Sequence, residues 1–272
     1  RLNSKSFFAN NVTHWIKRKE NERGIELISR NAFRTQPHHL RITPGMYPDL
    51  INAGNEYKAL SQSVRYNAFA SDSRFSFLSA VVFGNVRFSP TANVKIEHQR
   101  LHSVMEITAN DNATHAVLND DMRNNINWTR VNTGISLDVA YNGDNLKISF
   151  SMPVTYQYTV MNAPQTKRKM QNIGKFYFQP SLMTRYRFTN QLEANGAAGY
   201  YTLTPGLMTL YPGYILQNYR TINRYNARLF DTSSLIASLG LSYKNVLNMF
   251  FASGDISFSH DPVSYTHLTL PT

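Results

Sequence analysis

The stretch from Leu146 to Val160 alternates apolar and polar residues without a break, and no other feature of the chain restricts its fold as strongly. The even positions are Leu146, Ile148, Phe150, Met152, Val154, Tyr156, Tyr158 and Val160. The odd positions are Lys147, Ser149, Ser151, Pro153, Thr155, Gln157 and Thr159. Successive side chains of a β-strand point to opposite faces, so the pattern predicts one apolar and one polar face. Strands of soluble proteins are commonly about 5–6 residues long, whereas a strand that crosses a bilayer needs about 9–11. The segment therefore favours a membrane-spanning strand.

The preceding segment has the same periodicity. One predicted face carries Val131, Thr133, Ile135, Leu137, Val139 and Tyr141, and the other carries Asn132, Gly134, Ser136, Asp138 and Ala140. Asn142–Asn145 lies between the two segments and contains Asn-Gly, a pair that tolerates positive φ and strongly indicates a hairpin turn. The two segments are therefore predicted to form one long hairpin.

Four further pairs of segments alternate less regularly. The expected hairpins join Phe7–Ile16 to Ile25–Thr35 through Lys19–Gly24, Phe75–Phe88 to Val94–Ile107 through Ser89–Asn93, Phe176–Phe188 to Leu192–Tyr200 through Thr189–Gln191, and Leu235–Tyr243 to Phe250–His260 through Lys244-Asn245. Long polar segments separate them: Gln36–Lys58, Ala109–Asn125, Asn162–Asn172 and Thr204–Arg220. Short turns that alternate with long loops are typical of bacterial outer-membrane barrels. We expect about 11 or 12 strands in a single all-β, antiparallel, transmembrane barrel domain.

The composition agrees with a barrel and excludes several other classes. Charged residues are 17% of the chain, below the ~25% of ordinary soluble domains. The chain has no cysteine, which excludes disulfide scaffolds, thiolate metal sites and cysteine nucleophiles. No run approaches the ~18 apolar residues of a membrane-spanning helix. Because only helices and closed barrels satisfy the backbone in lipid, a membrane protein of this sequence has to be a barrel.

The positive charge does not indicate a nucleic-acid partner. Lysine and arginine number 28 against 17 acidic residues, a formal net charge of +11. The basic residues are scattered, and the tight runs Lys17–Lys19 and Lys167–Lys169 are flanked by polar or acidic, turn-like sequence. Nucleic-acid surfaces are instead expected to concentrate basic residues on one face, so we expect no nucleic-acid partner.

Three segments carry a resemblance to a known family. Arg23–Arg30, Pro37–Leu50 and Tyr211–Thr221 resemble TonB-dependent receptors of the Bacteroidetes type, and the likeness extends from about residue 23 to residue 260. The resemblance implies an outer-membrane barrel that is plugged by an N-terminal domain, energised by TonB across the periplasm and in contact with outer-membrane lipid. It also implies an extracellular ligand, with a surface lipoprotein as a candidate partner. Such barrels have ~22 strands, so about 11 or 12 would be roughly half.

The two ends of the chain suggest a piece of a longer protein. The sequence begins at Arg1 with neither an initiator methionine nor a signal-peptide pattern, and no plug or TonB-contact segment is recognisable. Residues 263–272 resemble one reading frame of a sequencing adapter, so we expect an artefact there. Residues 1–262 are the expected partial barrel domain.

The candidate ligand-binding residues are aromatic: Trp128, Tyr211, Tyr214 and Tyr219. Aromatic faces bind sugars and other flat ligands, which would make these residues ligand contacts. The alternative, favoured about two to one, is an interfacial girdle, since Tyr and Trp prefer the level of the lipid headgroups.

The sequence predicts neither an enzyme nor a cofactor. It contains no Gly-x-Ser-x-Gly, Walker or dinucleotide motif. His98 and His102 are four apart on a predicted strand, about 13 Å and too far for one ion. His38 and His39 would face opposite ways, and Asp120-Asp121 matches no calcium loop.

Three functional hypotheses follow from these features. The first is uptake of an unidentified ligand by a partial TonB-dependent receptor in the bacterial outer membrane. The second is a soluble or secreted β-sandwich that acts as a binding module, which predicts shorter strands in two packed sheets. The third is a smaller barrel that acts as a porin or as an outer-membrane enzyme.

Overall fold

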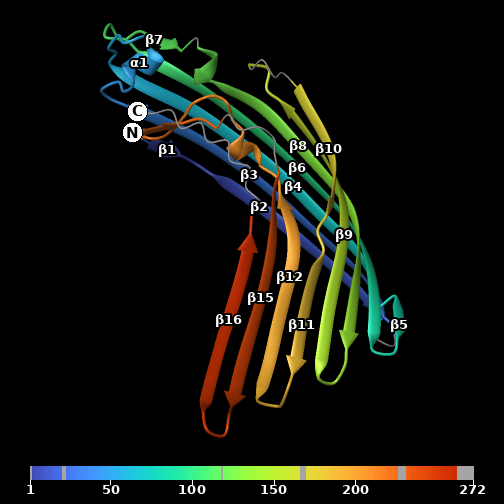
Figure 1. Ribbon diagram of the computed structural model, residues 1–272. Coiled ribbons are helices and arrows are strands. Elements are labelled where there is room, and N and C mark those ends of the chain that lie inside the picture. The colour runs from blue at the N-terminus through green and yellow to red at the C-terminus, as the bar shows by residue number, and fades with distance from the viewer. Residues whose placement is uncertain (1, 20–22, 118, 166–169, 226–230, 262–272) are drawn as a thin grey trace.

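A computed structural model describes residues 2–19, 23–117, 119–165, 170–225 and 231–261. Most of the chain forms one antiparallel sheet of 14 strands that curves into an open half-barrel (Figure 1). The strands of this sheet are β1 (Leu2–Ser4), β2 (Phe7–Arg18), β3 (Gly24–Ile42), β4 (Ala59–Leu78), β5 (Val81–Phe83), β6 (Val86–Thr108), β7 (Thr114–Ala116), β8 (Asn124–Asn142), β9 (Leu146–Asn162), β10 (Met170–Phe178), β11 (Ser181–Arg187), β12 (Leu192–Leu203), β15 (Thr232–Asn245) and β16 (Phe250–His260).

The remaining elements are short. A second sheet pairs β13 (Ile215–Asn218) with β14 (Thr221–Asn223), and the helical turns are α1 (Pro48–Ile51), η1 (Asp120–Met122) and η2 (Leu207–Thr209). No helix in the described part of the chain is long and apolar enough to cross a bilayer.

The main sheet is ten strand positions wide, in the order β1-β3-β4-β6-β8-β9-β11-β12-β15-β16. β1 and β2 share one position because both pair with β3, and β10 and β11 share another because both pair with β9. The eleven strands of seven or more residues agree with the predicted number. Within the described ranges no pairing joins β16 to β1 or β2, so the barrel is not closed. One continuous sheet also makes the β-sandwich hypothesis wrong.

Several strands are longer than a bilayer requires. β6 has 23 residues, which corresponds to about 75 Å at ~3.3 Å per residue. Tilted by about 45°, it still rises more than the ~30 Å of the hydrocarbon core. The short turns lie together at one end of the sheet, here called the turn end (Figure 1). The long connections, α1 and β7 lie at the other, here called the loop end, where these strands extend furthest.

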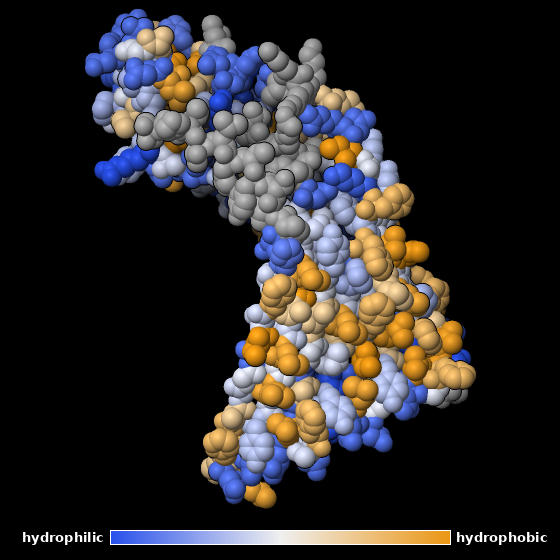
Figure 2. Space-filling view, in the orientation of Figure 1, coloured by the Kyte–Doolittle hydropathy of each residue, from blue (hydrophilic) through white to orange (hydrophobic). Residues whose placement is uncertain are grey.

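The predicted hairpin of β8 and β9 is confirmed, and its register places the two faces as the alternation requires. Val131 lies opposite Tyr158 on one face, and Asn132 lies opposite Gln157 on the other. The first face is apolar along both strands and is here called the outer face; the second is polar and is called the inner face. Figure 2 shows hydrophobic side chains over the lower part of the sheet, whereas the end that carries α1 and β7 is mainly hydrophilic.

The predicted turn at Ser89–Asn93 is wrong. These residues lie inside β6 and pair with β8, for example Thr91 with Ser136. The chain turns earlier, between β4 and β6, where Gly84 has φ +57°. Turn-forming residue types suggested a break, but the polar and apolar positions still alternate through it. Pro90 fits the strand because the ladder to β4 ends at Thr91 and the ladder to β5 begins at Phe88, so no hydrogen bond is lost there.

Other predicted boundaries shift by a few residues. Residues 36–42 belong to β3 rather than to the following loop, because they continue the ladder with β4. Lys244-Asn245 ends β15, and the turn is at Val246–Met249. The predicted strand Phe176–Phe188 is interrupted at Gln179-Pro180, where proline lacks a backbone donor. The hairpin of β11 and β12 is confirmed.

Candidate functional site

The connection between β12 and β15 folds back over the inner face at the loop end (Figure 1). Its residues 204–225 include η2, β13 and β14, and are here called the docked segment. Leu207 and Leu210 are almost fully buried against inner-face residues of β6, β8 and β9. The buried members of this cluster are Tyr66, Leu101, Ile126, Trp128, Met161, Ala163, Leu207, Leu210 and Tyr211. The inner face is therefore polar towards the turn end and covered by an apolar contact at the loop end.

A buried glutamine holds β13 against the sheet. Gln62 on β4 is 1% exposed, and its side-chain Nε2 donates to the carbonyl of Tyr214 at 2.9 Å. Its Oε1 accepts from the backbone N–H of Leu216 at 2.7 Å. The side-chain amide thus pairs with one backbone group of β13 and one of the residue just before it, as a neighbouring strand would, because it offers both a donor and an acceptor.

An asparagine repeats the arrangement at the start of β8. Asn124 is fully buried and donates from Nδ2 to the carbonyl of Gly213 at 3.1 Å, while the N–H of Gly213 donates to its Oδ1 at 2.8 Å. Nδ2 also donates to the hydroxyl of Ser103 at 2.8 Å. A Cβ at residue 213 would overlap the carbonyl oxygen of Arg123, so only glycine allows this close approach.

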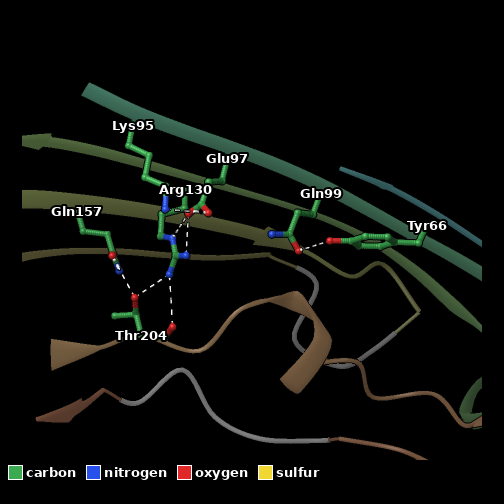
Figure 3. A network of polar contacts seen from close by, with 7 residues as sticks. All are labelled: Tyr66, Lys95, Glu97, Gln99, Arg130, Gln157 and Thr204. Atoms are coloured by element: carbon green, nitrogen blue, oxygen red, sulfur yellow. Dashed lines mark hydrogen bonds and ion pairs between the residues drawn. The ribbon is translucent and has the colours of Figure 1, made fainter. Parts of the chain in front are cut away.

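An ion network fixes the beginning of the docked segment (Figure 3). Arg130 on β8 donates from Nε to Glu97 on β6 at 2.7 Å. Both side chains are largely buried, with exposed fractions of 13% for Arg130 and 14% for Glu97. Lys95 lies 3.1 Å from the same carboxylate. The other side of the guanidinium donates to the hydroxyl of Thr204 at 2.7 Å, and that hydroxyl donates to Gln157 at 3.2 Å.

A recess of about 230 Å³ lies beside this network. Its lining includes Lys95, Arg130, Gln157, Tyr177 and Thr204. Asn132 also lines the recess, and its Oδ1 is buried without a hydrogen-bond partner among the described residues. A buried polar atom of this kind is usually satisfied by water or a ligand group, so the recess is a small polar site on the inner face.

The structure separates the four aromatic candidates. Trp128 is fully buried and Tyr211 is 5% exposed, both beneath the docked segment on the inner face. The girdle interpretation is therefore wrong for these two residues, because a girdle has to face lipid. Trp128 instead packs under the guanidinium of Arg130, whose Cζ lies 4.7 Å from the ring centroid. Neither ring is accessible to a ligand in this conformation.

The other two candidates are more accessible. Tyr214 is half-buried, with the Cζ of Arg224 at 4.8 Å from its ring centroid. Tyr219 is 56% exposed and has Arg220 at 4.9 Å. Tyr219 lines a second recess, of about 500 Å³, together with Leu2, Arg41 and Met46 at the loop end. Of the four, Tyr219 is the side chain that a ligand at the loop end could reach.

Exposed aromatic side chains occupy the turn end of the outer face instead. Three pairs of rings lie there: Phe75 with Phe77, Tyr186 with Phe188, and Tyr243 with Phe250, with centroids 4.9, 4.7 and 6.0 Å apart. Each pair flanks a short turn, where an aromatic girdle is expected at a membrane boundary. None of these residues is among the aromatic candidates predicted from the sequence, although the position of each pair near a short turn could have indicated them.

Two tyrosines of the long connections have perturbed acidities. The hydroxyl of Tyr57 donates to the carbonyl of Met46, and burial raises the pKa of Tyr57 to about 12. Burial also raises the pKa of Tyr211, with a further upward contribution from Tyr225, against a downward one from a hydrogen bond with Gln217. Both hydroxyls stay protonated near neutral pH and act as structural hydrogen-bonding groups.

The histidine pairs lie apart from the docked segment, whereas Asp121 contacts it. His98 and His102 are on the outer face of β6, His39 is on the outer face of β3, and His38 is on its inner face. Asp120-Asp121 is in η1, where Asp121 lies 3.3 Å from Arg224. Across the described ranges no group of three or more His, Asp or Glu side chains could hold a metal ion.

Comparisons with solved structures define the fold. The unliganded ferric citrate transporter FecA superposes with a TM-score of 0.62 at 10% identity, over 98% of this chain and 37% of that protein. The copper transporter OprC gives 0.60 at 8% identity, over 93% and 38%. The ferric yersiniabactin uptake receptor FyuA from Yersinia pestis gives 0.50 at 11% identity, over 96% and 35%. No family model matches the sequence, and no curated protein matches it.

These likenesses and the geometry together define an outer-membrane type of β-barrel, seen as an open part of one. More narrowly, the fold is that of a TonB-dependent receptor-like barrel, of which the chain spans somewhat more than a third of the length of the three solved relatives. The three solved proteins are described as two transporters and an uptake receptor.

Proposed function

We propose that residues 1–262 are part of the barrel domain of a TonB-dependent receptor that takes up a ligand across the bacterial outer membrane. The observation that carries this proposal is the docked segment, which covers the inner face of a lipid-compatible half-barrel at the loop end. A barrel wall with an apolar outer face supplies the membrane anchor. A folded inner cover narrows the lumen where a ligand would enter.

The partners in this proposal are a plug domain, TonB and an extracellular ligand, with a surface lipoprotein as a further candidate. Ligand capture falls to the loop end, where the recess beside Tyr219 combines an aromatic ring with Arg41. Entry of the ligand then requires the docked segment to shift or the plug to rearrange. The solved proteins of the same fold are described as transporters of ferric citrate and of copper and as an uptake receptor for ferric yersiniabactin.

The proposal is tested on the complete protein in the outer membrane of a Gram-negative host. A folded barrel runs with a different mobility before and after boiling in detergent, because the sheet survives until it is heated. We expect this shift, and we expect the complete protein to be retained by an immobilised periplasmic domain of TonB. A complete protein that stays in the aqueous phase without detergent and shows no shift contradicts the proposal.

The half-barrel itself supplies a second test. The outer edges of β2 and β16 expose unpaired backbone groups, and such edges promote aggregation. We therefore expect that residues 1–262 produced alone do not form a native transporter. A monodisperse, folded sample of this segment would contradict the expectation that further strands complete the barrel.

A further inference from the structure

The outer face of β3, β4 and β6 changes character along its length. Over 25–35 on β3, 69–77 on β4 and 86–96 on β6, its outward side chains carry no charge. Nearer the loop end the outward side chains include six basic ones among uncharged residues such as Ser63 and Asn67. These six exposed basic residues, here called the basic belt, are His39, Arg41, Arg65, His98, Arg100 and His102. Glu106 is the single acidic residue on the outward positions of these three strands from Thr35 to the loops.

The belt residues lie next to one another across the strands. Arg65 on β4 is directly opposite His102 on β6, and Arg100 is opposite the neighbouring Asn67. Arg100 is thus the diagonal neighbour of Arg65, and diagonal neighbours lie about 7–8 Å apart. The two arginines therefore form one cluster of positive charge on the outer face.

No carboxylate of the described chain neutralises the two arginines. Arg65 and Arg100 form no ion pair with the described residues, whereas two cations of the inner face do: Arg130 pairs with Glu97, and Lys175 pairs with Asp231. The described chain therefore leaves the counter-charge of these two outward arginines to the surroundings.

The position of the belt indicates which surroundings these are. Arg100 is four residues beyond Ile96, the last residue of the uncharged stretch of β6, which corresponds to about 13 Å along the strand. Phe69 lies directly opposite His98, so the belt begins where the apolar surface ends. A surface that passes from apolar to basic along the strand matches a leaflet that passes from acyl chains to anionic headgroups.

We propose that the basic belt binds the phosphate groups of lipid headgroups in the leaflet at the loop end. Arg65 and Arg100 are its centre, because a guanidinium binds phosphate through two parallel N–H donors and remains charged at all relevant pH values. This inference rests on the proposed function, since it requires the apolar outer face to lie in a membrane.

The test uses the complete protein in bilayer nanodiscs that contain equal amounts of phosphatidylglycerol and phosphatidylcholine. Spin-labelled forms of the two lipids report, by electron paramagnetic resonance, which one is enriched beside the protein. We expect enrichment of phosphatidylglycerol that weakens at high salt, because the attraction is screened. The double variant R65Q/R100Q should lose it, by about fivefold for each arginine at low salt.

The matched control is R30Q/R34Q, which removes two exposed arginines from the inner face of β3. It changes the net charge by the same amount but should leave the enrichment unchanged. Equal loss in both double variants, or no enrichment in the wild type, overturns the inference and leaves the proposed function standing. Full competition by dissolved inorganic phosphate also overturns it, since the site would then take free phosphate. A wild-type protein that inserts into no bilayer overturns the proposed function as well.

Discussion

The side-chain amide of Gln62 is hydrogen-bonded to the backbone N–H of Leu216, which lies 154 residues further along the chain. The same amide donates to the carbonyl of Tyr214, so a single β4 side chain satisfies one backbone group of β13 and one of the residue just before it. Gln62 and Leu216 are each 1% exposed, so the bond between them is buried. This relationship makes the docked segment part of the barrel wall rather than a free loop, and its stability can be measured.

Replacement of Gln62 by methionine should release the docked segment. The change keeps the shape of the side chain but removes the partners of the Tyr214 carbonyl and of the buried N–H of Leu216, at a cost of about 1–3 kcal/mol for the buried N–H. Hydrogen exchange of residues 204–225 should accelerate accordingly. The control Gln179→Met removes one hydrogen bond, to the carbonyl of Thr202, and should leave that exchange unchanged. Equal protection in Gln62→Met and wild type would contradict the role of Gln62.

Replacement of Gly213 by alanine should displace the same segment by a steric route. The added methyl group would meet the carbonyl oxygen of Arg123 and the amide of Asn124, and such overpacking costs about 1–3 kcal/mol. Gly206→Ala is the matched control, because nothing lies within 4 Å of a Cβ there. Limited proteolysis in the docked segment should be faster only in the first variant. Similar cleavage of the two variants would show that Gly213 is not held as described.

The pair of Glu97 and Arg130 should be strongly coupled. Leucine at 97 leaves the charge of Arg130 largely buried without a counter-charge, at a cost of about 3 kcal/mol. Leucine at 130 should cost less, because Glu97 keeps Lys95 at 3.1 Å. Both single variants remove the same ion pair, so adding their effects counts that loss twice. The double variant E97L/R130L should therefore be much more stable than the sum of the single effects predicts. Denaturant unfolding in detergent provides the four free energies of the cycle. Additive effects would mean that Arg130 depends mainly on Thr204 and Trp128 instead.

The loop end should be sensitive to alkaline pH through Tyr57. Its folded-state pKa of about 12 lies above the ordinary value of 10.0, so the neutral hydroxyl contributes stability that is fully present below pH 10. That contribution decreases as the pH rises and is lost by about pH 12. Absorbance of tyrosinate should therefore show a late step that is missing in Tyr57→Phe. Identical titration curves for the two proteins would argue against a buried Tyr57 hydroxyl.

Arginine should be tolerated on one face of β9 and not on the other. Met152 is on the outer face, and arginine there would enter the acyl region at a cost of up to about 2–4 kcal/mol. Ser151 is the adjacent inner-face residue and lies opposite Asp138, so arginine there would face a carboxylate. We expect the yield of folded, heat-modifiable protein to fall for Met152→Arg and to persist for Ser151→Arg. The reverse order would mean that the two faces have been assigned wrongly.

The strands could be predicted from the sequence wherever alternation and turn chemistry agree. The hairpin of β8 and β9 satisfies both criteria, and its register is as expected. At Ser89–Asn93 the two criteria conflict, and alternation is the better guide because cross-strand pairing continues through residues that also favour turns. The unbroken polar positions Ser89, Thr91 and Asn93 were the signal that this stretch is a strand.

The candidate site was predictable only in part. Trp128 has the same parity as Asn132 and Gly134, so its inner-face position could have been read from the alternation. The cover over it could not, because the amides of Gln62 and Asn124 pair with backbone groups 152 and 89 residues away. Side chain to backbone pairing leaves no periodic pattern in either segment, so only the folded chain reveals it.

The docked segment has a mechanical consequence. It leaves the sheet at β12 and returns at β15, yet its β13 is fastened to β4, which lies five strand positions from β12. It therefore crosses the concave inner face and fixes the distance between two parts of the sheet that share no hydrogen-bond ladder. Release of the docked segment from β4 would allow the sheet to flatten, so the distance between β4 and β12 at the loop end would increase.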